Sequence, residues 1–179
     1  MLDAAGVAHQ AIPANIDEGA AKSKQSDPGA LALDLAKAKA EAVSANHSED
    51  WVIGSDSVVS VDGRLFDKPV TREDAADHLR FFSGKAIQLT SAVALARGGA
   101  ADWSHCESAA LHVRSLSETF ISDYLGHEWP AVSHCVGVFR LEGPGVQLFD
   151  RIEGDHFTIL GMPLLPLLAA LRHRQILQS

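Results

Sequence analysis

Apolar residues recur every three or four positions along residues 29–45, a stretch rich in alanine. This spacing is typical of an amphipathic helix whose apolar face packs against a core. That face would carry Leu31, Leu35, Ala38 and Ala42. Asp27 and Pro28 precede the stretch, and they supply an N-cap side chain and a first-turn proline. The pattern therefore predicts one long helix here.

A second helical pattern covers residues 72–82, where four apolar or aromatic side chains form a stripe: Ala75, His78, Leu79 and Phe82. Thr71 and Asp74 have the spacing of a capping box, with Asp in place of the usual Glu. Ser83 and Gly84 would end the helix.

Alternation of apolar and polar residues marks strands in the middle of the chain. Residues 87–96 alternate in this way, Gly98 and Gly99 form a turn, and residues 109–113 resume the pattern. We expect two long antiparallel strands. Ser117 should cap a further helix that runs to Tyr124, and residues 164–171 read as a terminal helix that begins at a proline.

The stretch from Ile53 to Pro69 carries the most chemical information. An apolar run ends at Gly54 and Ser55, so we expect a corner that leaves Asp56 where a buried strand emerges. A second β-prone run follows and ends at Asp62-Gly63, which favours a tight hairpin turn. The hairpin would bring Lys68 towards Asp56, a combination that indicates metal and phosphate chemistry. An ordinary surface turn with a solvated aspartate is the alternative.

Composition narrows the possible functions. The 179 residues are 46% hydrophobic and 21% charged, which predicts one globular domain over residues 1–179, built as two lobes. The net charge of −8 argues against binding of a nucleic-acid polymer, because a phosphate backbone needs clustered Lys and Arg. A small anionic ligand, held by a few lysines and a metal ion, stays compatible with that charge.

The two cysteines, Cys106 and Cys135, form neither a CxxC pair nor a metal-binding spacing, and reduced thiols are expected. No basic leader sequence or apolar run long enough to span a bilayer is visible. We therefore expect a cytoplasmic protein without a membrane partner.

Several short segments occur in an order that resembles the Maf family of nucleoside triphosphate pyrophosphatases over essentially the whole chain. They are IDE, LAKAKA, VIGSDSVV, DG, KP, SGK, HVRSLSE, IEG and LGMPL. The segment HCVGVFRLEGPGVQLFDRIEG is similar to the subgroup that acts on 7-methyl-GTP. Each segment alone is a weak signal, whereas their order and spacing together are strong.

The resemblance implies a set of site residues. Asp56 matches the family's catalytic aspartate, Lys39 its helix lysine and Lys68 the lysine of its KP motif, while Glu18 matches its early acidic motif. Glu142 falls where pyrimidine-selective members carry a glutamine, so it is expected to select the base. Glu18 and Asp56 would hold Mg²⁺ or Mn²⁺, which prefer oxygen ligands, and the two lysines would bind phosphate.

The resemblance also implies an α/β fold in which a bent mixed sheet and flanking helices surround a deep cleft, similar to inosine-triphosphate pyrophosphatases, and a homodimer. Family members open with a strand and a Ser-x-Ser-Pro-Arg-Arg phosphate loop, and this sequence begins just after that point. We therefore expect an unfilled position in the sheet, with unpaired backbone groups.

The reaction expected from the resemblance is hydrolysis of a nucleoside triphosphate, such as 7-methyl-GTP or a related modified nucleotide, to the monophosphate and pyrophosphate. A nucleotide-binding or regulatory protein of the same fold, which has lost turnover together with the phosphate loop, is the alternative. A housecleaning enzyme of the related inosine-triphosphatase fold is a further one.

Overall fold

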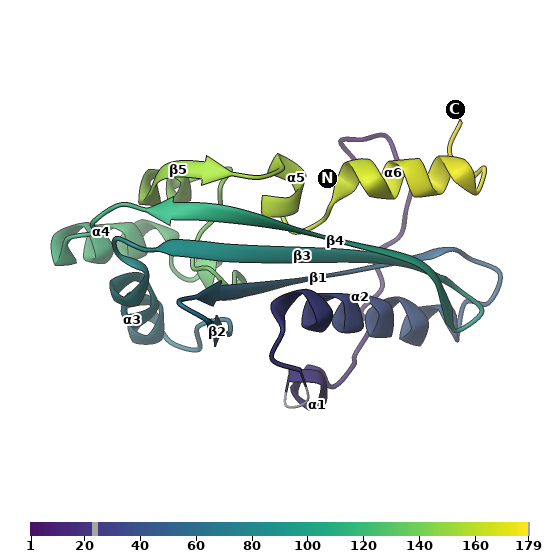
Figure 1. Cartoon of the computed structure of the whole chain (residues 1–179), viewed down its shortest axis with the longest axis horizontal. Coiled ribbons are helices and arrows are strands. Elements are labelled where there is room, and N and C mark those ends of the chain that lie inside the picture. The colour runs from purple at the N-terminus through teal and green to yellow at the C-terminus, as the bar shows by residue number, and fades with distance from the viewer. Residues whose placement is uncertain (23–24, 179) are drawn as a thin grey trace. The chain divides into compact units, whose positions relative to one another are not determined.

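The computed structural model describes residues 1–22 and 25–178. Its helices are α1 (Glu18–Lys22), α2 (Pro28–Ser44), α3 (Arg72–Phe82), α4 (Glu118–Glu128), α5 (His156–Ile159) and α6 (Leu164–His173), with 3₁₀ turns η1 (Ala131–His134) and η2 (Pro144–Leu148). Its strands are β1 (Val52–Val61), β2 (Arg64–Phe66), β3 (Ala86–Arg97), β4 (Ala100–Val113) and β5 (Phe149–Glu153). They form one five-stranded sheet in the order β2-β1-β3-β4-β5 (Figure 1). The expected α/β fold is thus confirmed, although the sheet is antiparallel where a mixed sheet was expected.

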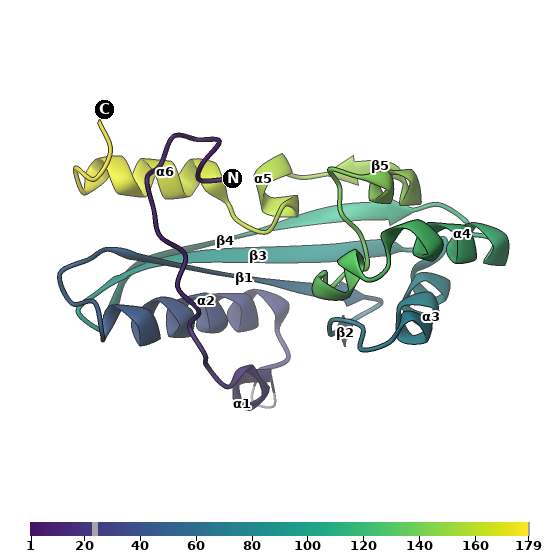
Figure 2. The same ribbon diagram turned by 180° about the vertical axis from the view of Figure 1, so that it is seen from behind.

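The chain divides into two compact units, and the long strands contribute residues to both. The first unit consists of the described residues of 1–57, 90–107 and 155–179, and the second of residues 58–89 and 108–154. In the first unit, α2 covers one face of the strands and α6 covers the other (Figures 1 and 2).

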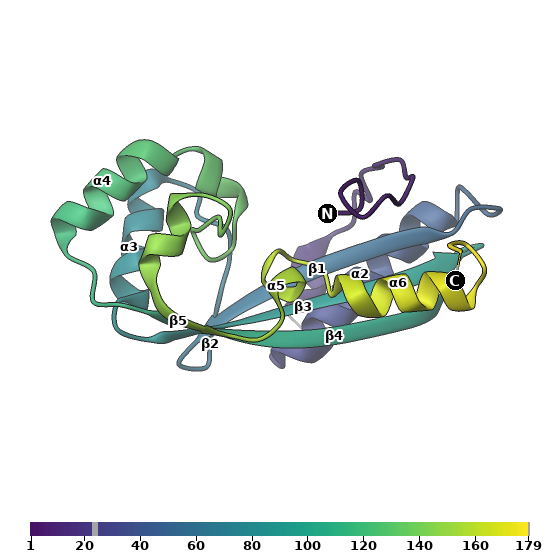
Figure 3. The same ribbon diagram turned by 90° about the horizontal axis from the view of Figure 1, so that it is seen from above.

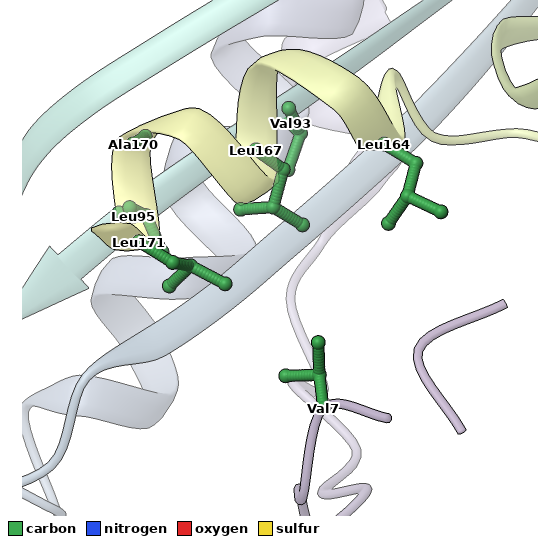
Figure 4. Packing of buried hydrophobic residues seen from close by; sticks show 7 residues of the cluster. All are labelled: Val7, Val93, Leu95, Leu164, Leu167, Ala170 and Leu171. Atoms are coloured by element: carbon green, nitrogen blue, oxygen red, sulfur yellow. The ribbon is translucent and has the colours of Figure 1, made fainter. Parts of the chain in front are cut away.

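The packing of α6 explains the apolar pattern near the end of the chain. Its buried side chains Leu164, Leu167, Ala170 and Leu171 meet β3 residues and Val7 in one cluster (Figure 4). Val93 and Leu95 of β3 are fully buried there. Burial of apolar area, at roughly 25 cal/mol per Å², stabilises α6 in its place. The predicted terminal helix is confirmed.

The second unit contains α3 and α4, which lie side by side (Figure 3). The Thr71 side chain accepts a hydrogen bond from the Asp74 N–H, and Asp74 accepts one from the Thr71 N–H, so the predicted capping box is present. The β1–β2 hairpin turns through Asp62 (φ 51°) and Gly63 (φ 76°), and Val61 pairs with Arg64. Two successive positive φ angles are the signature of the primed turn that Asp-Gly favours.

Two elements were predicted too short, a strand at its beginning and a helix at its end. Strand β4 begins at Ala100, not at residue 109, because Gly98 (φ 59°) and Gly99 (φ 83°) make a two-residue turn that pairs the chain with β3 at once. Helix α4 ends at Glu128, not at Tyr124. Its last turn buries Leu125 and Glu128, and such tertiary contacts extend a helix beyond its sequence pattern.

The predicted corner before Asp56 is wrong. Strand β1 runs without a break from Val52 to Val61, so Asp56 lies in mid-strand. Gly54 is needed for a different reason: a Cβ atom on it would lie 2.7 Å from the Ala40 backbone nitrogen and would collide with the Ala36 carbonyl oxygen. The glycine therefore lets the backbones of β1 and α2 approach each other closely.

Residues 7–17 have no helix or strand, and Figure 2 shows them crossing the strands from the side of α6 to α1. Strand β2 pairs only with Val59, Ser60 and Val61 of β1. In the described part of the chain, residues 52–57 of β1 consequently have no strand on that side. Within the same residues, no helix has the length and apolarity needed to cross a membrane.

Candidate functional site

The close contact between α2 and β1 brings two predicted site residues together. Lys39 lies one turn beyond Ala36, which packs against Gly54, and Asp56 lies two residues beyond Gly54 on the same face of β1. The Lys39 Nζ is 2.5 Å from Asp56 Oδ1. Only 12% of the Asp56 side chain is exposed, against 24% for Lys39. The pair is therefore a largely buried ion pair in the first unit.

Glu18, the first residue of α1, completes this cluster. Its Oε1 lies 2.7 Å from the same Lys39 Nζ, so one ammonium group bridges two carboxylates from different segments. Lys22 adds a longer contact to Glu18, at 3.9 Å. The resemblance placed Glu18, Lys39 and Asp56 in one site, and in the structure both carboxylates contact the Lys39 ammonium group.

The environment shifts the proton affinity of both partners in the ion pair. Burial acts to lower the pKa of Lys39, but hydrogen bonds to Asp56 and Glu18 outweigh it and raise that pKa above its ordinary value. Burial raises the pKa of Asp56, and its hydrogen bond to Lys39 offsets only part of this effect. A carboxylate with a raised pKa is a better proton acceptor than a solvated one, so Asp56 suits general-base chemistry.

The opposite face of β1 is held by serines that the sequence reasoning missed. Ser55 Oγ lies 2.8 Å from the Gly161 carbonyl oxygen, and Ser57 Oγ lies 2.7 Å from Ser91 Oγ. Ser91 in turn donates to the Thr158 carbonyl oxygen at 2.8 Å. These bonds attach β1 to α5 and the loop after it on both sides of Asp56. The sequence did contain a signal for these serines: they lie one residue before and one residue after Asp56, so in a strand both point to the face opposite Asp56.

A cavity of about 930 Å³ lies beside this cluster, within the first unit. Glu18 and Lys39 line it, together with Trp51, residues 52–55 of β1 and polar side chains of the N-terminal segment such as His9 and Asn15. Its volume falls within the range of small-molecule sites.

Lys68 and Glu142, the other two predicted site residues, belong to the second unit, where both are exposed. They share a neighbourhood, since the charges of both act on the thiol of Cys135. Burial is the main cause that raises the pKa of this thiol, while Arg140 and Lys68 oppose it. A thiol with a raised pKa is poorly ionised at neutral pH, which argues against Cys135 as a nucleophile.

The carboxylates of Glu18 and Asp56 fit a divalent ion such as Mg²⁺ or Mn²⁺. These ions take oxygen ligands, and Mg²⁺ is commonly bound by one or two carboxylates while waters and substrate phosphates complete its shell. Residues 1–22 and 25–178 hold no group of three or more His, Cys, Asp or Glu side chains arranged for a metal. A donor set of two carboxylates therefore suits an ion that arrives with a phosphate ligand.

Comparison with known proteins identifies the family of this chain. Residues 1–174 match the family model described as Maf-like protein. The chain is 46% identical over 181 residues to a protein of Granulibacter bethesdensis named nucleoside triphosphate pyrophosphatase, an alignment that covers 99% of this chain and 92% of the relative. It is 48% identical over 176 residues to a protein of Rhizobium etli named 7-methyl-GTP pyrophosphatase, which covers 96% and 88%. Because the family model spans nearly the whole chain, this protein belongs to the Maf family.

Proposed function

We propose that this protein hydrolyses nucleoside triphosphates to the nucleoside monophosphate and pyrophosphate. The observation that carries the proposal is the contact of Lys39 with both Glu18 and Asp56, beside a ligand-sized cavity that Glu18 and Lys39 line. Relatives that bear the names nucleoside triphosphate pyrophosphatase and 7-methyl-GTP pyrophosphatase support it.

Proton transfer, phosphate binding and metal binding are divided among the residues of the cluster and Lys68 in this proposal. Asp56 accepts the proton of the attacking water, because it is largely buried and its pKa is raised by that burial. Lys39 stays protonated and binds phosphate oxygens as a point charge. Glu18 and Asp56 would hold Mg²⁺ or Mn²⁺, which when bound neutralises charge on the phosphate oxygens. Lys68 provides a second cation for the phosphates.

The preferred substrate in this proposal is 7-methyl-GTP or a related modified nucleotide, and the relative from Rhizobium etli supports that choice. The 7-methylguanine base is cationic and offers N–H donors along one edge. Glu142 is exposed and anionic, so it would accept these hydrogen bonds and favour the cationic base over neutral guanine. We further expect a cytoplasmic homodimer. Light scattering would measure the mass of the particle in solution.

The test is a product assay with the purified protein and Mg²⁺ or Mn²⁺. We expect pyrophosphate as the first product from 7-methyl-GTP, and less product from GTP. Orthophosphate as the first product would assign the protein to another class of hydrolase. Tight nucleotide binding without any turnover would instead support a nucleotide-binding or regulatory protein.

A further inference from the structure

The segment that carries Glu142 is a series of tight turns in the second unit. The Gly143 N–H donates to the Arg140 carbonyl oxygen at 3.2 Å, so Leu141 and Glu142 occupy the two central positions of a turn. A Cβ atom on Gly145 would lie 2.5 Å from the Arg140 carbonyl oxygen and 2.7 Å from the Arg140 nitrogen. The backbone of Arg140 therefore packs against Gly145 and accepts the hydrogen bond that closes this turn.

The side chain of Arg140 is fixed to α4. Its Nε and Nη2 atoms donate to Glu128 Oε2 at 3.0 and 2.8 Å. Glu128 is only 4% exposed, which is rare for a carboxylate, and a buried carboxylate requires a partner of this kind. A Cβ atom on Gly143 would also lie 3.9 Å from Glu128 Oε2, so the turn passes directly over the pair.

A second attachment lies one helical turn earlier on α4. The Tyr124 hydroxyl, in a side chain that is 5% exposed, donates to the Val138 carbonyl oxygen at 2.9 Å. Val138 has a φ of 58°, a strained conformation for a β-branched residue that only surrounding structure can maintain. Tyr124 and Glu128 are four residues apart and thus lie on the same face of α4.

We propose that Tyr124 and Glu128 are positioning residues for base selection, which hold the Arg140–Gly143 turn and so fix the place of Glu142. This inference rests on the proposed function, because Glu142 is there the group that reads the base. A side chain that contacts the nucleotide base can discriminate between nucleotides only if it is held in a fixed position. The buried ion pair of Glu128 with Arg140 and the hydrogen bond of Tyr124 to Val138 give the turn that rigidity.

The experiment compares Glu128→Gln and Tyr124→Phe with wild type on 7-methyl-GTP, GTP and UTP, and measures amide hydrogen exchange in parallel. Glu118→Gln is the matched control, since it is the same substitution on the same helix at a side chain that is 70% exposed. In Glu128→Gln we expect faster exchange in residues 138–146 and a loss of about fivefold or more in the preference between nucleotides. The kcat on the least preferred nucleotide should stay close to that of wild type.

Tyr124→Phe keeps the ring and loses one hydrogen bond, so it should give a smaller effect of the same kind even if Glu128→Gln folds poorly. Faster exchange with an unchanged nucleotide preference would show that the contacts serve stability alone, and would overturn the proposal. If wild type turns over no nucleotide, the proposed function fails, and the ratio of dissociation constants for the same three nucleotides then decides the role of Glu128. A wild type without any preference, in turnover or binding, also overturns it.

Discussion

Lys39 of α2 and Asp56 of β1 face each other at 2.5 Å because Gly54 removes the side chain that would keep the two backbones apart. The glycine packs against Ala36 and Ala40, and the ion pair lies just beyond that contact. A small residue two positions before Asp56 is thus part of how the site is built, although it carries no chemistry.

Substitution Gly54→Ala should therefore damage both stability and activity. The added methyl group must displace α2 or β1, and overpacking of this kind costs about 1–3 kcal/mol. We expect a lower melting temperature and a larger loss of kcat than of substrate affinity. Gly126→Ala is the control: nothing lies within 4 Å of its added Cβ atom, and alanine favours a helix. Equal melting temperatures for the two variants would contradict the packing argument.

Asp56→Asn should abolish most turnover while the fold survives. The amide has nearly the shape of the carboxylate, but it does not accept the proton of water and it binds a divalent ion more weakly because it carries no charge, so kcat should fall roughly 100-fold or more. Asp34→Asn, at an exposed position of α2, should leave kcat unchanged. A folded Asp56→Asn protein with the wild-type rate would remove Asp56 from the reaction.

The pH dependence of kcat/KM should report on Asp56. Because burial raises the pKa of Asp56 and a general base must be ionised, activity should fall on acidification at a pH above the ordinary aspartate range. Lys39 favours the ionised form, so Lys39→Met should move this acid limb to still higher pH. Lys37→Met, on the same helix, should not move it. An acid limb at the same pH in all three proteins would exclude Asp56 as the titrating group.

His78 should make the protein less stable in acid. Its ring packs against Phe66 and Phe82, burial lowers its pKa, and its Nδ1 is buried without a hydrogen-bond partner among the described residues. The folded state therefore binds a proton more weakly than the unfolded state. Its contribution to stability is complete above the unfolded pKa of about 6.5 and declines as the pH falls towards the lowered pKa.

Urea unfolding of wild type and His78→Leu at neutral pH and near pH 5 checks this expectation. The variant should lose less stability than wild type between the two pH values. His173→Gln, at an exposed position, is the control and should behave as wild type does. An identical pH dependence in wild type and His78→Leu would show that other groups cause the acid sensitivity.

The sequence by itself determined the elements whose signals are local. The N-cap Asp27, the capping box of Thr71 and Asp74, and the Asp62-Gly63 turn each act within a few residues, and all three formed as predicted. Helix α3 has the predicted bounds for this reason. The order of short motifs also identified the family, because each motif keeps its place in the chain regardless of how distant segments pack.

Only the tertiary structure decided what depends on contacts between distant segments. Gly54 looked like a corner, yet it serves the approach of α2, which no local pattern encodes. Glu128 looked like a residue beyond the end of a helix, yet its burial against Arg140 extends that helix. The contact of Lys39 with Glu18 likewise joins residues that are far apart in sequence. Burial and close packing are properties of the folded chain. The roles of Gly54 and Glu128 could therefore be identified only once their neighbours in space were known.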